Sequence, residues 1–302
     1  MAFPPHLSTY NPSKIVTAID HAVRFPEVLA VADLKYADEI SAFKKLLSSS
    51  KTSAELLEKI RSKTFNASQR MTFLKIFRRA VSPVLDTEMA KRMSVPTSTL
   101  VAAIGETFKP IELLKQQFNG MSSQQEAALA ALIGEYDTRG QLGYILTGRF
   151  FDWFEREFGR DFTIEGPRGA GRDVELSSIY SEYEGNFPCD FVIRSRSDGM
   201  VRAIGFARYD STRGGAQSDD RTSGNADKVT KARAFCRATG KNFRLIFLSD
   251  GPGMVHRDTW EEACFLDGQW DGNVRVTTLR TADERVTFDW LMSTTGGVVL
   301  VP

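Results

Sequence analysis

The stretch from Phe187 to Arg221 constrains the fold most, because its pattern is typical of a β-hairpin that carries charged residues at one end. Its first strand, FPCDFVIR (187–194), is apolar and contains one acid, Asp190. The polar turn 197–199 follows, and MVRAIGFAR (200–208) is expected to form the second strand. After it comes a run to Arg221 that is rich in Arg, Asp, Gly and Gln.

The hairpin predicts which side chains lie near Asp190. Residues equally far from a hairpin turn face each other, so Asp190 is expected across from Ala207. Side chains alternate between the two faces of a strand, so Phe206, Arg208 and Asp210 share one face. The pattern therefore predicts a site in which one acid lies opposite a cation and a second acid.

This arrangement resembles the PD-(D/E)XK nuclease superfamily, and within it the type II restriction endonucleases. Pro188-Cys189-Asp190 stands for the P-D element, and Phe206-Ala207-Arg208 stands for (D/E)-X-K. Two positions depart from the family pattern: Phe206 replaces the second acid, and Arg208 replaces the lysine. The resemblance covers roughly the C-terminal half of the chain.

In members that read CCGG-like sites, the second carboxylate lies on a following helix, a dozen or so residues downstream. Asp219 and Asp220 lie at about that distance from Arg208, and Asp210 is a nearer substitute. The resemblance thus implies a Mg²⁺ ion held by Asp190 with Asp210 or Asp220.

The chemistry of phosphodiester cleavage fits these residue types. Mg²⁺ prefers carboxylate oxygens, polarises the phosphate and activates water. A neighbouring cation stabilises charge that develops on the phosphate oxygens. Arg208 supplies that charge, but arginine stays protonated in proteins, so Arg208 is expected to act by electrostatics and orientation only.

The run 209–225, YDSTRGGAQSDDRTSGN, has the side chains that read base edges in DNA. The expected base-reading residues are Arg213, Gln217, Asp219, Arg221 and Asn225, and Lys228, Lys231 and Arg233 extend the positive face. The same composition is also that of a long surface loop. The run directly follows the acid-bearing hairpin, which favours contact with DNA.

The rest of the chain predicts two domains. Apolar residues recur at helical spacing from residue 26 to about residue 139, and strands alternate with helices after residue 140. We therefore expect a helical N-terminal region, 1–139, and an α/β domain, 140–302, with a mixed central sheet flanked by helices.

Three further segments have functional interpretations. Segment 87–108 resembles a helix-turn-helix, and it also fits two ordinary helices packed at an angle. The turn GPRGAGRD (166–173) offers Arg168 or Arg172 to a DNA backbone, and Asp173 is another candidate acid. Glu155 and Glu157 precede the first core strand, where the resembling family often carries an acid that faces the site; both also fit a solvated helix face.

Composition limits the other classes of function. The net charge is +1, which counts mildly against nucleic acid, although a nuclease needs only a basic cleft. Three scattered cysteines and three histidines predict neither a disulfide framework nor a zinc site. With no signal-peptide pattern and no apolar run of membrane-spanning length, we expect a soluble cytoplasmic protein.

Three functions therefore compete. The first is a Mg²⁺-dependent type II restriction endonuclease that acts as a homodimer on a short palindromic site in double-stranded DNA. The second, motivated by Phe206 and Arg208, is a catalytically inactive DNA-binding protein on the same fold. The third is a small-molecule phosphotransferase, indicated only by the Gly-rich turn at 166–171, which lacks a Walker pattern.

Overall fold

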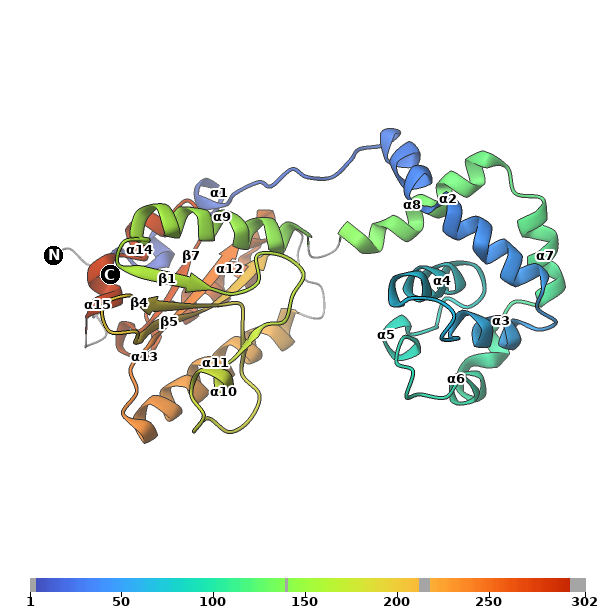
Figure 1. Cartoon of the computed structure of the whole chain (residues 1–302). Helices are drawn as coiled ribbons and strands as arrows, with labels where there is room; N and C mark the ends of the chain where they lie inside the picture. The colour runs from blue at the N-terminus through green and yellow to red at the C-terminus, as the bar shows by residue number, and fades with distance from the viewer. Residues whose placement is uncertain (1–3, 139–140, 212–217, 294–302) are drawn as a thin grey trace. The chain divides into compact units, whose positions relative to one another are not determined.

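The chain divides into two compact units, which Figure 1 shows with their elements labelled. The computed structural model describes residues 4–138, 141–211 and 218–293, without the side chains of 136–138 and 218–223. Residues 22–139 form one unit, here called the helical unit; residues 1–21 and 140–302 form the other, here called the sheet unit.

The division corrects the predicted assignment of residues 1–21 to the helical region. This segment packs on the sheet unit instead, because its backbone donates hydrogen bonds to buried carboxylates there. The N–H of Leu7 donates to Asp267 Oδ2 at 2.9 Å, and the N–H of Thr17 donates to Asp250 Oδ1 at 2.6 Å. Periodicity could not show this contact, since the partners lie more than two hundred residues apart in the chain.

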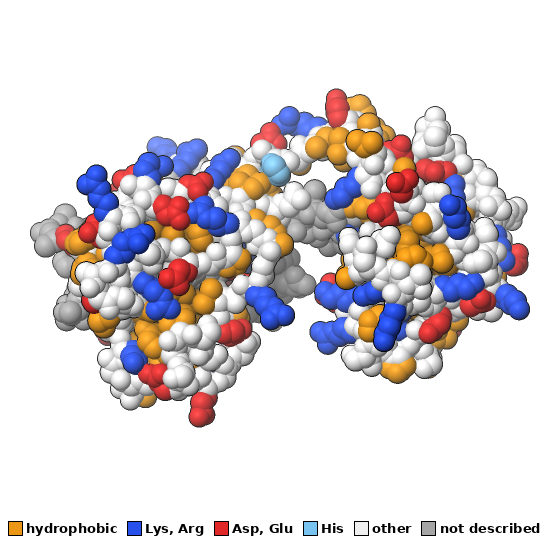
Figure 2. All heavy atoms as spheres, in the orientation of Figure 1, with side chains coloured by type: hydrophobic (Ala, Val, Ile, Leu, Met, Phe, Trp, Pro, Cys, Tyr) orange, Lys and Arg blue, Asp and Glu red, His pale blue; other side chains and the backbone are white. Residues whose placement is uncertain are grey.

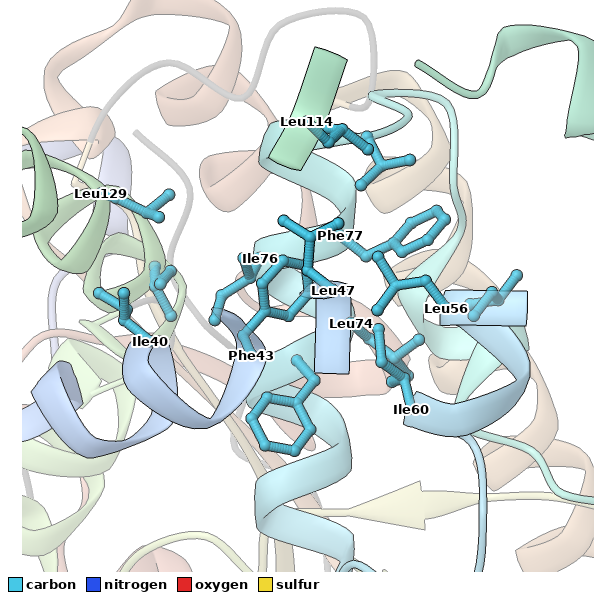
Figure 3. Close-up of a cluster of buried hydrophobic side chains, with 14 of the residues drawn as sticks. Ile40, Phe43, Leu47, Leu56, Ile60, Leu74, Ile76, Phe77, Leu114 and Leu129 are labelled. Atoms are coloured by element: carbon cyan, nitrogen blue, oxygen red, sulfur yellow. The ribbon is translucent and has the colours of Figure 1, made fainter. Parts of the chain in front are cut away.

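The helical unit consists of short helices around one apolar core. Its elements are α2 (Glu27–Ser48), α3 (Ser53–Ile60), α4 (Ala67–Ala80), α5 (Thr87–Ala90), α6 (Thr97–Ile104), the 3₁₀ turn η2 (Gly105–Thr107), α7 (Ile111–Asn119) and α8 (Ser123–Thr138). Figure 3 shows side chains of α2, α3, α4, α7 and α8 pointing into this core, among them Phe43, Ile60, Phe77 and Leu114.

Segment 87–108 contains α5 and α6, and the second of these begins at Thr97, as the helix-turn-helix pattern predicts. The first helix is a single turn, Thr87–Ala90. The connection between the helices is fixed from inside by Arg61, which is 4% exposed and donates to the carbonyls of Ala90 and Arg92. Arg61 Nη1 also donates to the Thr97 hydroxyl at 2.7 Å, so a hydroxyl expected to face a DNA groove has an internal partner.

The sheet unit contains all the strands of the described residues. Its elements are η1 (Leu7–Thr9), α1 (Pro12–Ile15), α9 (Gln141–Phe158), β1 (Phe162–Glu165), β2 (Val174–Glu175), α10 (Leu176–Ile179), β3 (Pro188–Cys189), β4 (Phe191–Ser195), β5 (Val201–Tyr209), α11 (Ser218–Thr239), β6 (Arg244–Asp250), η4 (Pro252–Val255), α12 (Arg257–Leu266), α13 (Gln269–Gly272), β7 (Val274–Thr277), α14 (Ala282–Arg285) and α15 (Phe288–Met292).

The central sheet is mixed, with strand order β1-β4-β5-β6-β7. β4 pairs antiparallel with both β1 and β5. β6 pairs in parallel with β5 on one side and with β7 on the other. β2 and β3 form a separate two-stranded ribbon. The predicted mixed α/β fold with a helical N-terminal region is therefore confirmed.

The two faces of the sheet have different apolar covers. On one face, α9 and α15 pack over Phe191, Ala203 and Ile246. On the other, α11 and α12 pack over Ile204, Phe206 and Leu245, and Figure 1 shows α9 and α11 on opposite sides of the strands. The alternation along β5 places Phe206 and Arg208 on the side of α11.

Gly205 allows the β4–β5 hairpin to pack against α9. A Cβ atom at position 205 would lie 1.9 Å from the ring of Phe191, which pairs with Gly205 across the hairpin. That ring is fully buried and lies 5.2 Å, centroid to centroid, from Phe150 of α9. The hairpin therefore requires glycine at position 205, across from Phe191. Phe191 directly follows Asp190 in the chain.

Candidate active site

A cavity of about 430 Å³ lies where the C-terminal half of β5, β6 and α11 meet. It is lined by Asp190, Phe206, Ala207, Arg208, Gly224, Asn225, Lys228, Phe247 and Ser249. Asp190, Arg208, Asn225 and Lys228 were all expected to act at the site, so the fold brings together residues up to 38 positions apart.

The hairpin fixes the position of Asp190. Its N–H donates to the carbonyl of Gly205 at 2.9 Å, and its Oδ2 accepts from the N–H of Ala207 at 2.7 Å. Asp190 therefore lies across from Ala207, as its distance from the turn predicted. Its Oδ1 makes no hydrogen bond to any described residue, so one carboxylate oxygen has capacity for another partner.

The environment of Asp190 disfavours its ionised form. Burial raises the pKa of this carboxyl, and the nearby charge of Asp173 raises it further. The hydrogen bond from Ala207 and the charge of Lys228 act in the opposite direction without cancelling the effect of burial. A divalent cation beside Asp190 would favour the ionised form, because an opposite charge lowers the pKa of a carboxyl.

Lys228 of α11 is a cation whose charge acts on this acid. Its Nζ lies 3.9 Å from the centroid of the Phe206 ring. Burial lowers the pKa of Lys228, while the charges of Asp190 and Asp173 raise it in part. The sequence placed Lys228 among the DNA contacts; its place beside Asp190 depends on how α11 packs on the sheet, which the sequence pattern does not specify.

Arg208 lines the same cavity but is paired with a second acid. Its Nη2 lies 2.5 Å from Asp210 Oδ1. Asp210 is 6% exposed, and its backbone is held between the carbonyl of Asp250 and the N–H of Gly253. Asp210 is not among the residues that line the cavity, so its role as a metal ligand stays a prediction.

The expected base-reading run lies largely outside the described residues. Arg213 and Gln217 belong to the segment 212–217, which is not described. The backbone of Asp219, Asp220 and Arg221 is in the first turn of α11, and their side chains are not described. Asp219 and Asp220 thus lie on a helix that follows the hairpin, as the resemblance implied for the second carboxylate.

The Gly-rich turn before β2 uses its two arginines differently. Arg168 forms ion pairs with Asp152 and Glu155 of α9, both at 2.6 Å, and so ties the turn to that helix. Arg172 is exposed, as a phosphate contact requires, and its neighbour Asp173 acts on the charges of the cavity. Arg168 is the less suitable of the two to contact DNA, because two carboxylates already neutralise it.

A larger hollow, of about 890 Å³, lies between the end of α9 and β1. Its charged side chains, which include Glu155, Glu157, Arg160 and Arg196, are exposed. The smaller cavity is the better candidate site, because charged groups there are partly buried and act on one another.

No metal site is complete in the described part of the chain: no group of three or more His, Cys, Asp or Glu side chains is placed there to hold an ion. The donors available in the cavity are hard oxygen atoms of Asp190, Asn225 and Ser249. Mg²⁺ keeps several waters and needs only one or two carboxylates, so this set fits Mg²⁺ and does not fit a thiolate- or imidazole-bound metal.

Comparisons with family models, with curated proteins and with solved structures find no match to this chain. None of the helices within the described residues combines the length and the apolar character that crossing a bilayer requires. On the face drawn in Figure 2, Lys and Arg side chains are interspersed with Asp and Glu. Any attraction for a polyanion on this face is therefore local to a site.

Proposed function

We propose that this protein is a Mg²⁺-dependent endonuclease of the type II restriction kind, which hydrolyses phosphodiester bonds at a short site in double-stranded DNA. The observation that carries the proposal is the convergence of Asp190, Arg208 and Lys228 in one cavity at the end of the hairpin. The mixed sheet with helices on both faces, which the resemblance implied, supports it.

The acid and the cations have separate roles in this proposal. Asp190 would hold the metal through a carboxylate oxygen, together with waters and an acid from the first turn of α11, where the backbone of Asp220 lies. Bound Mg²⁺ supplies charge that polarises the phosphate and lowers the pKa of a coordinated water. Arg208 and Lys228 attract the DNA phosphate into the cavity and favour the extra negative charge of the transition state.

Double-stranded DNA and a second copy of the chain are the proposed partners. A palindromic duplex presents the same half-site twice, and a two-fold dimer presents the same cavity twice. Arg172, exposed in the turn before β2, and Asn225, which lines the cavity, are suited to phosphate and base contacts respectively. We place the protein in the cytoplasm, where such an enzyme meets DNA.

A catalytically inactive DNA-binding protein is the second candidate, and one observation favours it. Arg208 is paired with Asp210 at 2.5 Å, and Phe206 stands where the motif has an acid, so the strand itself offers neither a second carboxylate nor an unpaired cation to a metal-bound phosphate. This candidate predicts sequence-specific binding without cleavage.

The test is incubation of the purified protein with a long plasmid or phage DNA and Mg²⁺, followed by gel electrophoresis. An endonuclease gives discrete bands that disappear with EDTA, and Asp190→Asn lowers the rate by at least about 10³-fold. The matched control is Asp198→Asn, in the hairpin turn at the other end of the same strands, which leaves the rate unchanged. Intact DNA whose migration is retarded overturns cleavage and supports the inactive binding protein.

A further inference from the structure

The two departures from the nuclease motif lie on one strand, two residues apart. Arg208, in the position of the lysine, has its guanidinium against Asp210. Phe206, in the position of the acid, presents its ring to the cavity and stacks on Phe247 of β6, with 5.1 Å between ring centroids. At position 206 the strand therefore presents an apolar ring to the cavity, where the family has a charged carboxylate.

A positive charge from helix α11 lies over the ring of Phe206. Lys228 reaches the cavity from α11, and its Nζ lies 3.9 Å from the centroid of the Phe206 ring. An ammonium over the face of a phenyl ring is attracted by the ring quadrupole. The Phe206 ring thus holds the ammonium of Lys228 at the cavity.

We propose that Lys228 is the catalytic lysine of this site, carried by α11 instead of β5 and held in place by the ring of Phe206. This inference rests on the proposed nuclease function. It leaves Arg208, whose guanidinium is paired with Asp210, to help attract the phosphate into the cavity. Both departures from the motif then have one explanation. A lysine that reaches the cavity from the helix replaces the lysine of the strand, and the ring of Phe206 lies beneath its ammonium.

Lys228 acts by electrostatics in this proposal. Its ammonium contacts a non-bridging oxygen of the scissile phosphate and stabilises the charge that grows there in the transition state. The groups that face it are Asp190 and Arg208 on the cavity wall, Cys189 on β3 and Asp173 in the turn before β2. On its own helix, the neighbouring Asp227 is already paired with Lys231 at 2.6 Å.

Three substitutions separate this role from a structural one. Lys228→Gln lowers the single-turnover cleavage rate by about 10²–10³-fold at saturating protein, the size expected for one lost transition-state contact. Lys228→Arg keeps the charge and stays within about tenfold of the wild type. Lys241→Gln, which removes an exposed lysine that follows α11 and pairs with Glu182, is the matched control and changes the rate by less than about threefold.

The pH profile provides a readout that a structural role would not change. Because the pKa of Lys228 is lowered by burial, the wild-type rate falls on the alkaline side as this ammonium loses its proton below the usual lysine range. Arginine does not lose its proton there, so Lys228→Arg loses the alkaline limb. A Lys228→Gln rate within threefold of the wild type, or an unchanged alkaline limb in Lys228→Arg, overturns the inference.

A titration without DNA keeps this inference separate from the proposed function. The ¹³Cε signal of Lys228 reports its pKa by NMR in the wild-type chain and in Asp190→Asn. Because Asp190 raises this pKa, Asp190→Asn lowers it further if the two side chains share the cavity. A lowered pKa together with no cleavage by the wild type refutes the nuclease and retains the electrostatic coupling of Lys228 to Asp190. An unshifted pKa refutes the coupling itself.

Discussion

Buried charges occur at two places beside the same sheet, and they differ in how many hydrogen-bond and ion-pair partners they have. At the outer edge of β7, Asp267 and Arg285 have side chains no more than 1% exposed and form an ion pair. Asp267 also accepts from the N–H of Val276 at 3.0 Å and from the N–H of Leu7 at 2.9 Å. In the cavity, Asp190 accepts one hydrogen bond, from Ala207, and has an oxygen with no described partner.

The difference follows from what each place has to do. β7 is an edge strand, and an uncovered edge leaves backbone groups without partners. Asp267 binds the N–H of Val276, and Arg285 Nε donates to the Val276 carbonyl at 2.6 Å, so this pair, here called the edge pair, replaces a missing strand. In the cavity, by contrast, Asp190 satisfies one backbone N–H, that of Ala207, and its other oxygen has no described partner. We infer that the edge pair is structural and that the cavity charges serve a ligand.

Removing one half of the edge pair should have the largest effect on stability. Asp267→Ala leaves the Arg285 guanidinium buried without its counter-charge and uncovers the N–H of Val276. We expect a loss of about 3–5 kcal/mol in the free energy of unfolding, measured by urea denaturation. Glu261→Ala, which breaks an exposed pair with Arg257, is the control and should leave the midpoint unchanged. Equal midpoints for Asp267→Ala and the wild type would remove the structural role of the edge pair.

Gly205→Ala should have the next largest effect, and it should lower both stability and the rate of cleavage. The new methyl group meets the ring of Phe191, which cannot retreat because it packs against Phe150. We expect a loss of about 1–3 kcal/mol, together with slower cleavage, because Phe191 adjoins Asp190.

Gly148→Ala is the matched control for that substitution. A Cβ at position 148 meets nothing within 4 Å in helix α9, so alanine should raise stability by about 0.5–1 kcal/mol. Calorimetric melting of both variants measures the contrast. A stabilised Gly205→Ala would show that the hairpin tolerates the methyl group and that its register does not depend on glycine.

These two regions also show what the sequence could and could not predict. The hairpin, the parallel strand β6 and the end of α11 at Gly240, which has φ +71°, were predictable because apolar runs and turn residues are local signals. The position of Asp190 across from Ala207 followed from counting residues on either side of a turn.

Contacts between distant segments were not predictable in the same way. The docking of residues 1–21 on the sheet unit, the edge pair and the place of Lys228 over Phe206 each depend on how elements pack. A lysine on a polar helix face and a lysine over a phenyl ring have the same sequence signature. The spacing from Asp190 to the end of β5 could be predicted from the sequence. That α11 supplies the cation Lys228 to the cavity could not.

The smallest expected effect is that of Asp190 on stability. Burial raises the pKa of Asp190 in the folded chain above its unfolded value. The folded state therefore binds the proton more tightly, and the contribution of this group to stability is lost as pH rises through the raised pKa. Above the raised pKa the ionised carboxylate disfavours folding, so Asp190→Asn should there unfold at the same urea concentration as the wild type or at a slightly higher one. A lower midpoint would mean that Asp190 also has a structural role.

Cleavage and unfolding of Asp190→Asn and Asp267→Asn, measured side by side at neutral pH with Mg²⁺, test the contrast most directly. We predict opposite losses: Asp190→Asn keeps its unfolding midpoint and loses cleavage, whereas Asp267→Asn unfolds at lower urea and still cleaves in proportion to its folded fraction. Cleavage by Asp190→Asn at the wild-type rate would contradict the account, because the cavity would then not be the place where DNA is cut.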